Sequence, residues 1–527
     1  MGLVQDLQFA CRLLVKDKWF TLVAVVALSL GIGVNATVFT FVNAVLIRGL
    51  PFAHPEQIMA LSSRDVVRDR QMGVSYLDLK DWQASTQSFS ALAAHSGRTM
   101  NVSDEGRAPE RFSGALISGN GFALIGQAPA RGRGFLPEDD RPGAPAVVLL
   151  GDGVWKNRYG SDPSVVGRTI RINDVPSVVI GVMPEGFKFP QNADMWQPLS
   201  VIRELEHQKR NSRGLDVFGR LREGVSQTQA QAEMIGIGQR LASDHPDTNK
   251  DVQPHVQTFN ERVNGGTIRV VFLSLLGAVG FVLLIACANV ANLLLSRSAQ
   301  RSREMAVRVS IGATRWRIVR QLLMESLVLA LISGVLGLGL AAVGIRLFDL
   351  ATQDVGRPYW IEFTMDYRVF AYLAAVCLGT SVLFGLAPAL HVSKSDVNEI
   401  LKEGGRSGSA GMRVRRWTGA LVIGELALTL ALLAGAGFMM RNFLTMYRMD
   451  IGVETSNLLT MSLALPEQKY PAVEQRLAFY EQLQQRLDAN PRVRAVTVAS
   501  HSPMQGGFAR RLAIDGKSLG DGEQPAT

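Results

Sequence analysis

Five long apolar runs divide this chain into membrane-length and polar segments. The run 21–47 contains no charged residue. As a helix it would be about 40 Å long, which exceeds the roughly 30 Å hydrocarbon core of a bilayer. It is too long for a signal-peptide core and has no small-residue cleavage pattern, so we expect an uncleaved anchor. The five predicted spans are 19–47, 268–295, 321–348, 368–391 and 417–440.

The first 18 residues predict an amphipathic helix. Its apolar residues recur at helical spacing, and Arg12, Lys16 and Lys18 are interspersed among them. Because an uncharged run follows, we expect residues 1–18 to lie on the inner leaflet as an interfacial helix. The alternative is an ordinary N-terminal helix. The apolar positions are Val4, Leu7, Cys11, Leu14 and Val15.

The long polar region 52–265 predicts a folded α+β domain. Its helix and strand patterns are mixed, and about 210 residues are ample for a hydrophobic core. In residues 169–183, two strand patterns flank an Asn173-Asp174 turn. We also expect a buried strand at 147–150 and helices at 76–86 and 226–243.

The segment 296–320, between the second and third spans, is the most basic short stretch. It carries seven arginines against one acid, Glu304, which is typical of a cytoplasmic loop. Residues 300–311 predict a short helix, Gly312 is a plausible stop, and Thr314 can cap the third span. A segment that only set orientation would need no such order, so we expect it to meet a cytoplasmic partner.

The other basic segments agree with one topology. The loop 392–416 is basic, as is the segment before the first span. These segments share one side if the N-terminus is cytoplasmic, which leaves 52–265 and 441–527 outside. The net charge of +9 lies mainly beside the apolar runs. It therefore indicates membrane orientation and not a nucleic-acid partner.

The region after the fifth span repeats a pattern from the region after the first. Strand, helix and strand patterns occur at 57–63, 75–86 and 89–95, and again at 458–465, 472–489 and 493–500. This echo predicts an internal duplication. We expect 441–527 to be the start of a second outer domain that is incomplete, which makes the chain a truncated second copy.

Among the polar residues inside the predicted spans, four are candidates for buried contacts. An amide or a carboxylate in a bilayer needs a protein partner, so these residues predict a packed helix bundle. The small residues Gly31 and Gly33 would allow close helix contact. The acid of the fifth span should face the bundle and not lipid. The four residues are Asn35, Asn289, Asn292 and Glu425.

A search for catalytic chemistry finds little. The histidines of 52–265 show no paired metal-ligand spacing, and no nucleophile elbow occurs. The sequence Gly516-Lys517-Ser518 lacks the earlier glycine of a phosphate-binding loop, because Arg511 stands there. None of the three cysteines lies in a polar region between the runs. We expect no catalytic residue, no metal, no cofactor and no ATP hydrolysis by this chain.

Several stretches resemble the FtsX/MacB-type permeases of ABC transporters. The residues 303–315, Arg-Glu-Met-Ala-Val-Arg-Val-Ser-Ile-Gly-Ala-Thr-Arg, are similar to the signature of that family, as are the residues 321–326. Residues 28–39, 147–160 and 166–173 look like one branch, the duplicated permeases first noted in acidobacteria. The resemblance covers essentially the whole chain.

This resemblance implies an α-helical membrane protein of the bacterial inner membrane with a large MacB-like periplasmic core domain. It also implies four spans per repeat, and a dimer or a pseudo-dimer formed by duplicated halves. The segment 296–320 would contact an ABC ATPase made as a separate chain, whose ATP-driven dimerisation moves the periplasmic domains. The coupling residues would be Arg303, Glu304, Met305, Arg308, Val309 and Gly312.

Three functions remain open at this point. The first is a permease subunit for export or mechanotransmission, in contact with membrane lipid and the ATPase. The second is an FtsX-like regulator, whose outer domain binds a periplasmic partner protein such as a hydrolase. The third is a membrane-anchored enzyme, which the search for catalytic motifs disfavours.

Overall fold

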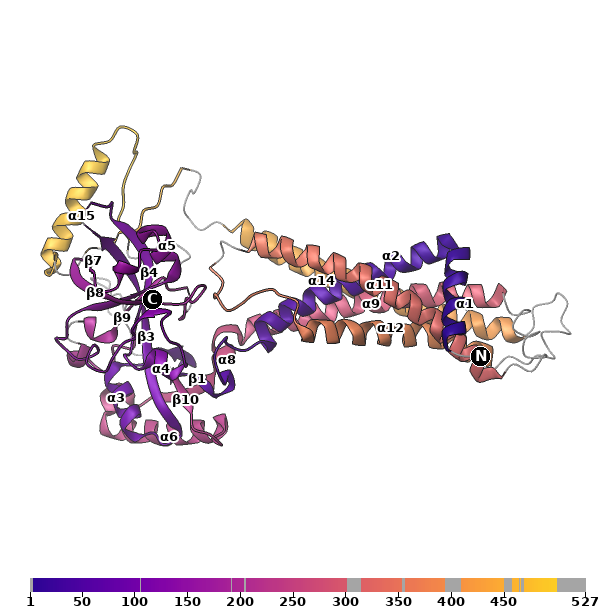
Figure 1. Ribbon diagram of the computed structural model, residues 1–527, viewed down its shortest axis with the longest axis horizontal. Coiled ribbons are helices and arrows are strands. Elements are labelled where there is room, and N and C mark those ends of the chain that lie inside the picture. The colour runs from indigo at the N-terminus through magenta and orange to yellow at the C-terminus, as the bar shows by residue number, and fades with distance from the viewer. Residues whose placement is uncertain are drawn as a thin grey trace, which may run out of the picture. The chain divides into compact units, whose positions relative to one another are not determined.

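The computed structural model of the chain forms two compact units. The first contains residues 1–100, 111–169 and 177–439, and the second contains 101–110, 170–176 and 440–527. The structure describes residues 3–104, 106–190, 192–202, 205–300, 314–352, 356–393, 409–449, 457–463, 465 and 469–499 (Figure 1).

Within these residues, five helical segments are long and apolar enough to cross a membrane. They coincide with the five apolar runs of the sequence. The helix α12 continues through Pro388 to its end at Ser393, so the proline does not terminate it. The helices are α1 (Leu3–Lys16), α2 (Lys18–Val42), continued by the π-helix Asn43–Ile47, α9 (Thr267–Gln300), α11 (Arg315–Ala351), α12 (Tyr367–Ser393) and α14 (Ser409–Tyr447).

The helices α2, α9, α11 and α12 pack side by side (Figure 1). Small residues bring two of them close together. A Cβ atom added to Gly33 of α2 would lie 3.0 Å from the carbonyl oxygen of Gly337 in α11. A Cβ atom there would be tighter than nearly all real Cβ contacts, so the prediction of close packing at Gly33 is confirmed. The core of the helix bundle includes the fully buried side chains of Leu28, Ile32, Leu329 and Phe384.

The outer part of the first unit is built on a mixed sheet. Its strand order is β11-β1-β10-β3-β4-β9-β6-β8-β5, and β2 pairs with β1. The pairs β4–β9 and β6–β8 are parallel, whereas the other pairs with a determined register are antiparallel. The strands are β1 (Ile58–Asp65), β2 (Arg70–Met72), β3 (Phe89–Ser103), β4 (Glu110–Ile117), β5 (Arg131–Gly132), β6 (Val147–Leu150), β8 (Val175–Val182), β9 (Met195–Pro198), β10 (Asp216–Leu221) and β11 (Val252–Thr258).

The short elements expected from the sequence form in this domain. The buried strand at 147–150 is β6, and the two expected helices are α3 and α6. Helix α6 begins with a capping box in which Ser226 and Gln229 each satisfy a backbone N–H of the other. The helices of the domain are α3 (Tyr76–Ser85), α4 (Gly121–Leu124), α5 (Asp152–Tyr159), α6 (Gln227–Asp244), α7 (Pro246–Asn249) and α8 (Phe259–Asn264).

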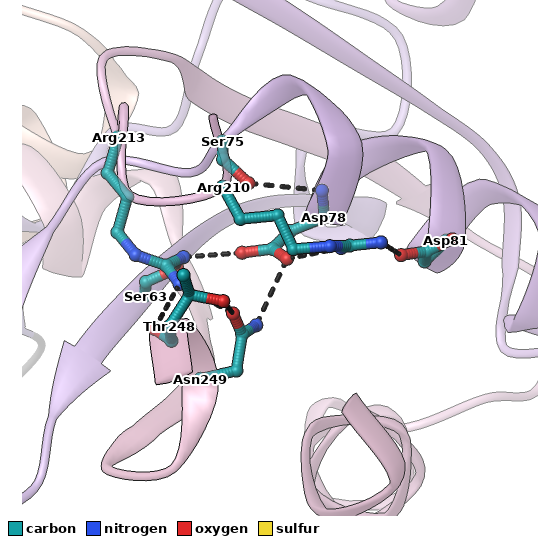
Figure 2. A network of polar contacts seen from close by, with 8 residues as sticks. All are labelled: Ser63, Ser75, Asp78, Asp81, Arg210, Arg213, Thr248 and Asn249. Carbon is teal, nitrogen blue, oxygen red and sulfur yellow. Dashed lines mark hydrogen bonds and ion pairs between the residues drawn. The ribbon is translucent and has the colours of Figure 1, made fainter. Parts of the chain in front are cut away.

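A buried ionic network ties α3 to distant parts of the domain (Figure 2). The carboxylate of Asp78, 1% exposed, pairs with Arg213 and accepts from Arg210 at 2.8 Å. The amide of Asn249 in α7 also donates to Asp78 at 3.0 Å. Ser75 caps α3 by accepting from the Asp78 backbone N–H at 3.1 Å. A buried charge needs such partners, so this network is a structural clamp.

The second unit contains the expected turn and one long helix. Strand β7 (Thr169–Ile172) pairs with the end of β3 at Val102 and Ile172. Asn173 and Asp174 have φ values of 49° and 68°, which is the backbone of a type I′ hairpin turn. This confirms the predicted turn.

The strands expected on either side of the predicted helix 472–489 are not found among the described residues. Helix α15 (Val473–Asp488) forms as predicted. Residues 457–463 and 493–499 form no strand. A segment with a strand pattern forms a strand only where a neighbouring segment pairs with its backbone N–H and C=O groups. Helix α15 buries none of its residues, so it packs on no such sheet. The prediction of strands at 458–465 and 493–500 is therefore wrong for the described residues.

Candidate functional site

The polar residue Asn35 joins three membrane helices. Its amide nitrogen donates to the carbonyl oxygen of Gly31 at 2.9 Å and to that of Val279 in α9 at 2.7 Å. The hydroxyl of Tyr372 in α12 lies 3.3 Å from the Asn35 amide oxygen. Asn35 is 2% exposed, so these bonds satisfy a polar group that lipid could not.

The other three polar residues differ in their surroundings. Asn289 is exposed, because α9 turns Cys287, Val290 and Ala291 toward the bundle and Asn289 away from it. The expectation that Asn289 packs inside the bundle is therefore wrong for this part of the chain. Asn292 is half-buried, and its amide oxygen has no hydrogen-bond partner among the described residues.

Glu425 lies on the half-buried face of α14. The half-buried residues of this helix recur at Leu421, Glu425, Leu428 and Leu432, whereas Ile423 is 70% exposed. This spacing of three and four residues defines one face of a helix. Its orientation toward a bundle stays a prediction, because α14 is otherwise largely exposed.

The outer end of the first span is held by two asparagines of the outer domain. Asn264 of α8 donates to the carbonyl oxygen of Val45 at 2.8 Å, and Asn260 donates to that of Leu46 at 2.7 Å. The last carbonyls of a helix lack partners within the helix, so these amides complete its end. Helix α8 leads directly into α9, so this contact ties the first span to the entry of the second.

The connection between α11 and α12 lies against the same region. The amide of Asn192 donates to the carbonyl oxygen of Arg357 at 2.7 Å. The ring of Trp360 lies 6.1 Å from that of Phe259 in α8, and Ile361 packs with Val45. We call residues 43–48, 259–264 and 356–366 the junction, because they join the helices to the outer domain.

Side-chain hydrogen bonds also link the end of the first span to the connection before α12. The amide of Asn43 donates to the carboxylate of Asp366 at 2.9 Å, which links the end of the first span to the start of α12. Arg48 donates to the Thr364 hydroxyl at 2.9 Å. The end of the first span is thus bonded to the outer domain and to the connection between α11 and α12.

A second polar cluster lies at the opposite ends of the helices. Arg297 of α9 donates to Glu325 of α11 at 3.0 Å and pairs with Asp17, which precedes α2. The side chains of Arg297 and Glu325 are 11% and 6% exposed. Arg320 also pairs with Asp6 of α1 at 2.6 Å. These pairs tie α1, α2, α9 and α11 together at the two ends of the segment 296–320.

The predicted coupling residues lie between those two ends. Arg303, Glu304, Met305, Arg308, Val309 and Gly312 all fall outside the described residues. Their role in coupling therefore stays a prediction. Within the described ranges, no group of three or more His, Cys, Asp or Glu side chains could hold a metal ion.

Two family models match the chain in succession. Residues 21–237 match the MacB-like periplasmic core domain, and residues 276–397 match the FtsX-like permease C-terminal domain. The first model covers most of the first span and most of the outer domain. The second model covers most of the second span together with the third and fourth spans. The chain is a MacB/FtsX-type permease.

Relatives of this permease carry export functions in their names. It is 25% identical over 288 residues to the macrolide export ATP-binding/permease protein MacB of Burkholderia thailandensis, covering 54% of this chain and 42% of that protein. It is 28% identical over 314 residues to the pyoverdine export ATP-binding/permease protein PvdT of Pseudomonas syringae pv. tomato, covering 55% and 44%. The permease thus spans less than half the length of these relatives.

Solved outer domains are more distant. The periplasmic region of MacB from Actinobacillus actinomycetemcomitans is 15% identical, with a TM-score of 0.31, and covers 42% of this chain and 94% of that one. The extracellular domain of the transporter YknZ from Gram-positive bacteria is 14% identical, with a TM-score of 0.30, covering 38% and 99%. The family assignment rests on the two family models.

The sequence pattern did not single out the junction residues Asn260 and Asn264. Asn260 and Asn264 lie four residues apart at the end of the outer domain, which places them on one helix face. That spacing was the available signal. Nothing in the local sequence names Val45 or Leu46 as their partners, because those residues are more than 200 positions away.

Proposed function

We propose that this permease couples ATP hydrolysis by a separate ABC ATPase to movement of its periplasmic domain, in export or in mechanotransmission. The protein would be embedded in the bacterial inner membrane. Its N-terminus and the segment 296–320 would lie in the cytoplasm. The observation that carries the proposal is the junction, where Asn264 and Asn260 bond the outer domain to the end of the first span.

The junction supports this role because it joins elements that a lever must move together. The amide–carbonyl bonds and the Asn43–Asp366 bond connect the end of the first span directly to α8 and to the start of α12. Movement of the helices would therefore reach the domain through short hydrogen bonds. The export names of the relatives favour the same class of function.

The opposite ends of the helices support an input site for the ATPase. The pairs Arg297–Glu325 and Arg320–Asp6 fix the helix ends on either side of the coupling residues. Exposed arginines alone contribute little binding energy, so the interface needs an apolar anchor ringed by charge. We assign Met305 and Val309 as the anchor, with Arg303, Arg308 and Glu304 around it, and Gly312 as the bend into α11.

Co-purification tests this assignment directly. Met305→Asp keeps every arginine, so the protein should insert normally and yet lose the ATPase when it is purified from membranes. Gly312→Leu should keep the protein in the membrane but impair ATP-driven activity. Met461→Asp is the matched control, because it makes the same change in the tail, where Met461 is 62% exposed. If Met305→Asp and Gly312→Leu both retain ATPase binding and activity, the proposed coupling is wrong.

A further inference from the structure

A hollow of about 430 Å³ opens in the outer domain of the first unit. It is lined by residues of β3, β4 and the start of β10, and by Pro190, Asn192 and Ala193. This volume is within the range of small-molecule sites, roughly 300–1,000 Å³. Its polar lining includes His95, Arg98, Arg111, Ser113, Asn192 and Asp216.

The charge in this hollow is unbalanced. Arg98 and Arg111 both line it, and neither forms an ion pair with a carboxylate among the described residues. The described contact of Arg111 is a hydrogen bond to the hydroxyl of Thr99 at 3.4 Å. The acid Asp216 is neutralised by Arg262 of α8 at 3.2 Å. The two arginines therefore present positive charge to anything that enters the hollow.

The imidazole of His95 offers a hydrogen-bonding group beside them. His95 is only 6% exposed, and its ring lies against the rings of Phe189 and Phe218. In the described part of the chain no group forms a hydrogen bond with this imidazole. Burial lowers the pKa of His95 to about 4, although Asp216 acts in the opposite direction. At neutral pH the ring is uncharged and can donate or accept one hydrogen bond.

We propose that this hollow binds a small organic anion that bears a carboxylate or a phosphate. Arg98 and Arg111 pair with the negative charge, and His95 hydrogen-bonds the ligand at the buried end of the hollow. Guanidinium groups suit planar or tetrahedral oxyanions, since their N–H groups bind two oxygens at once. Ser113 supplies a further hydroxyl to the ligand.

Two residues that line this hollow also bond to residues of the junction. Asn192 donates to the Arg357 carbonyl oxygen at 2.7 Å, in the connection that leads to α12. Asp216 pairs with Arg262 of α8, between Asn260 and Asn264 in the sequence. An anion that contacts Asn192 therefore alters the bond between the hollow and the connection before α12. This signalling step rests on the proposed coupling function, whereas anion binding does not.

Anion binding is tested with the full-length permease in detergent. The melting temperature is followed during titration with inorganic phosphate and, separately, with succinate, against sodium chloride of equal ionic strength. We expect a saturable rise with at least one of these anions. Arg98→Gln and Arg111→Gln should each weaken the apparent affinity roughly tenfold or more. Which anion acts distinguishes a phosphate ligand from a carboxylate ligand.

Arg70→Gln is the matched control, because Arg70 is exposed on β2, away from the hollow. It should bind as the wild type does. The anion site is refuted if neither anion gives a saturable rise, or if all four proteins bind equally. It is refuted as well if Arg70→Gln loses binding to the same extent, since the effect is then one of net charge.

Hydrogen exchange tests the signalling step separately. In the wild type, the anion should slow amide exchange at residues 356–361, and in Asn192→Ala this change should be lost. Unchanged exchange in a wild type that binds the anion would disprove signalling and leave the anion site standing. Retention of ATPase binding and activity by both Met305→Asp and Gly312→Leu would instead refute the proposed coupling, because neither residue is part of the hollow.

Discussion

The side-chain amide of Asn264 donates a hydrogen bond of 2.8 Å to the backbone carbonyl of Val45. The two residues are 219 positions apart, at the end of the outer domain and at the end of the first span. Asn264 is 6% exposed, so this bond is formed away from water. The outer domain is therefore hydrogen-bonded directly to the backbone of a membrane helix.

Removal of this amide should loosen the junction. Asn264→Ala leaves a carbonyl oxygen without its partner, at a cost of roughly 1–3 kcal/mol. We expect a lower melting temperature in detergent and weaker ATP-driven activity at equal expression. Asn157→Ala is the control, because Asn157 is exposed on α5. Equal melting temperatures for the two variants would show that the bond does not stabilise the junction.

The buried His95 should make the stability of the protein depend on pH. Burial lowers its pKa in the folded state to about 4, whereas the ordinary value is 6.5. As the pH falls below about 6.5 the unfolded chain binds a proton first, so the stability decreases until about pH 4 and then levels off. The total loss is on the order of 3 kcal/mol.

His95→Gln separates this effect from other titrations, because glutamine can hydrogen-bond but does not ionise. The difference in unfolding free energy between the wild type and His95→Gln should change between pH 7.5 and pH 4. Carboxylates whose pKa is lowered, such as Asp139 and Glu261, titrate in both proteins and cancel in the comparison. A difference that stays constant over this range would contradict the prediction.

Glu425 should face protein and not lipid. A charge at the centre of a bilayer costs roughly 2.5–3.5 kcal/mol on insertion scales. A spin label at position 425 should therefore be less accessible to oxygen in the lipid phase than one at Ile423, which is 70% exposed. Equal oxygen accessibility at the two positions would place the carboxylate among lipid tails.

The proposed topology predicts which cysteines react from outside the cell. In a Cys11→Ser background, cysteines at Ser85 and Ser462, both exposed, should react with a membrane-impermeant reagent once the outer membrane is permeabilised. A cysteine at Ser302 should not react. Cys11 is replaced because it is exposed, whereas Cys287 and Cys377 are buried. Labelling at Ser302 in intact cells would reverse the assigned orientation.

Much of the local structure follows from the sequence alone. The uncharged run of the first span, the Asn173-Asp174 turn and the Ser226 capping box are set by neighbouring residues. Each depends on an interaction or a conformation that involves only a few neighbouring positions. These are the burial of an apolar run, a left-handed backbone at a turn and a hydrogen bond to a backbone N–H. The apolar helix of the first run and the turn could therefore be predicted, and the structure confirms them. The capping box was found only in the structure.

The tertiary structure decided which distant residues meet. Asn35 and Asn289 lie in similar apolar surroundings in the sequence, but only Asn35 faces the bundle. Asn264 meets Val45, and Arg297 meets Glu325, because helix packing brings these residues together. Local pattern shows that a buried polar group needs a partner but cannot name the partner. That choice depends on how the helices and strands pack, a property of the whole chain.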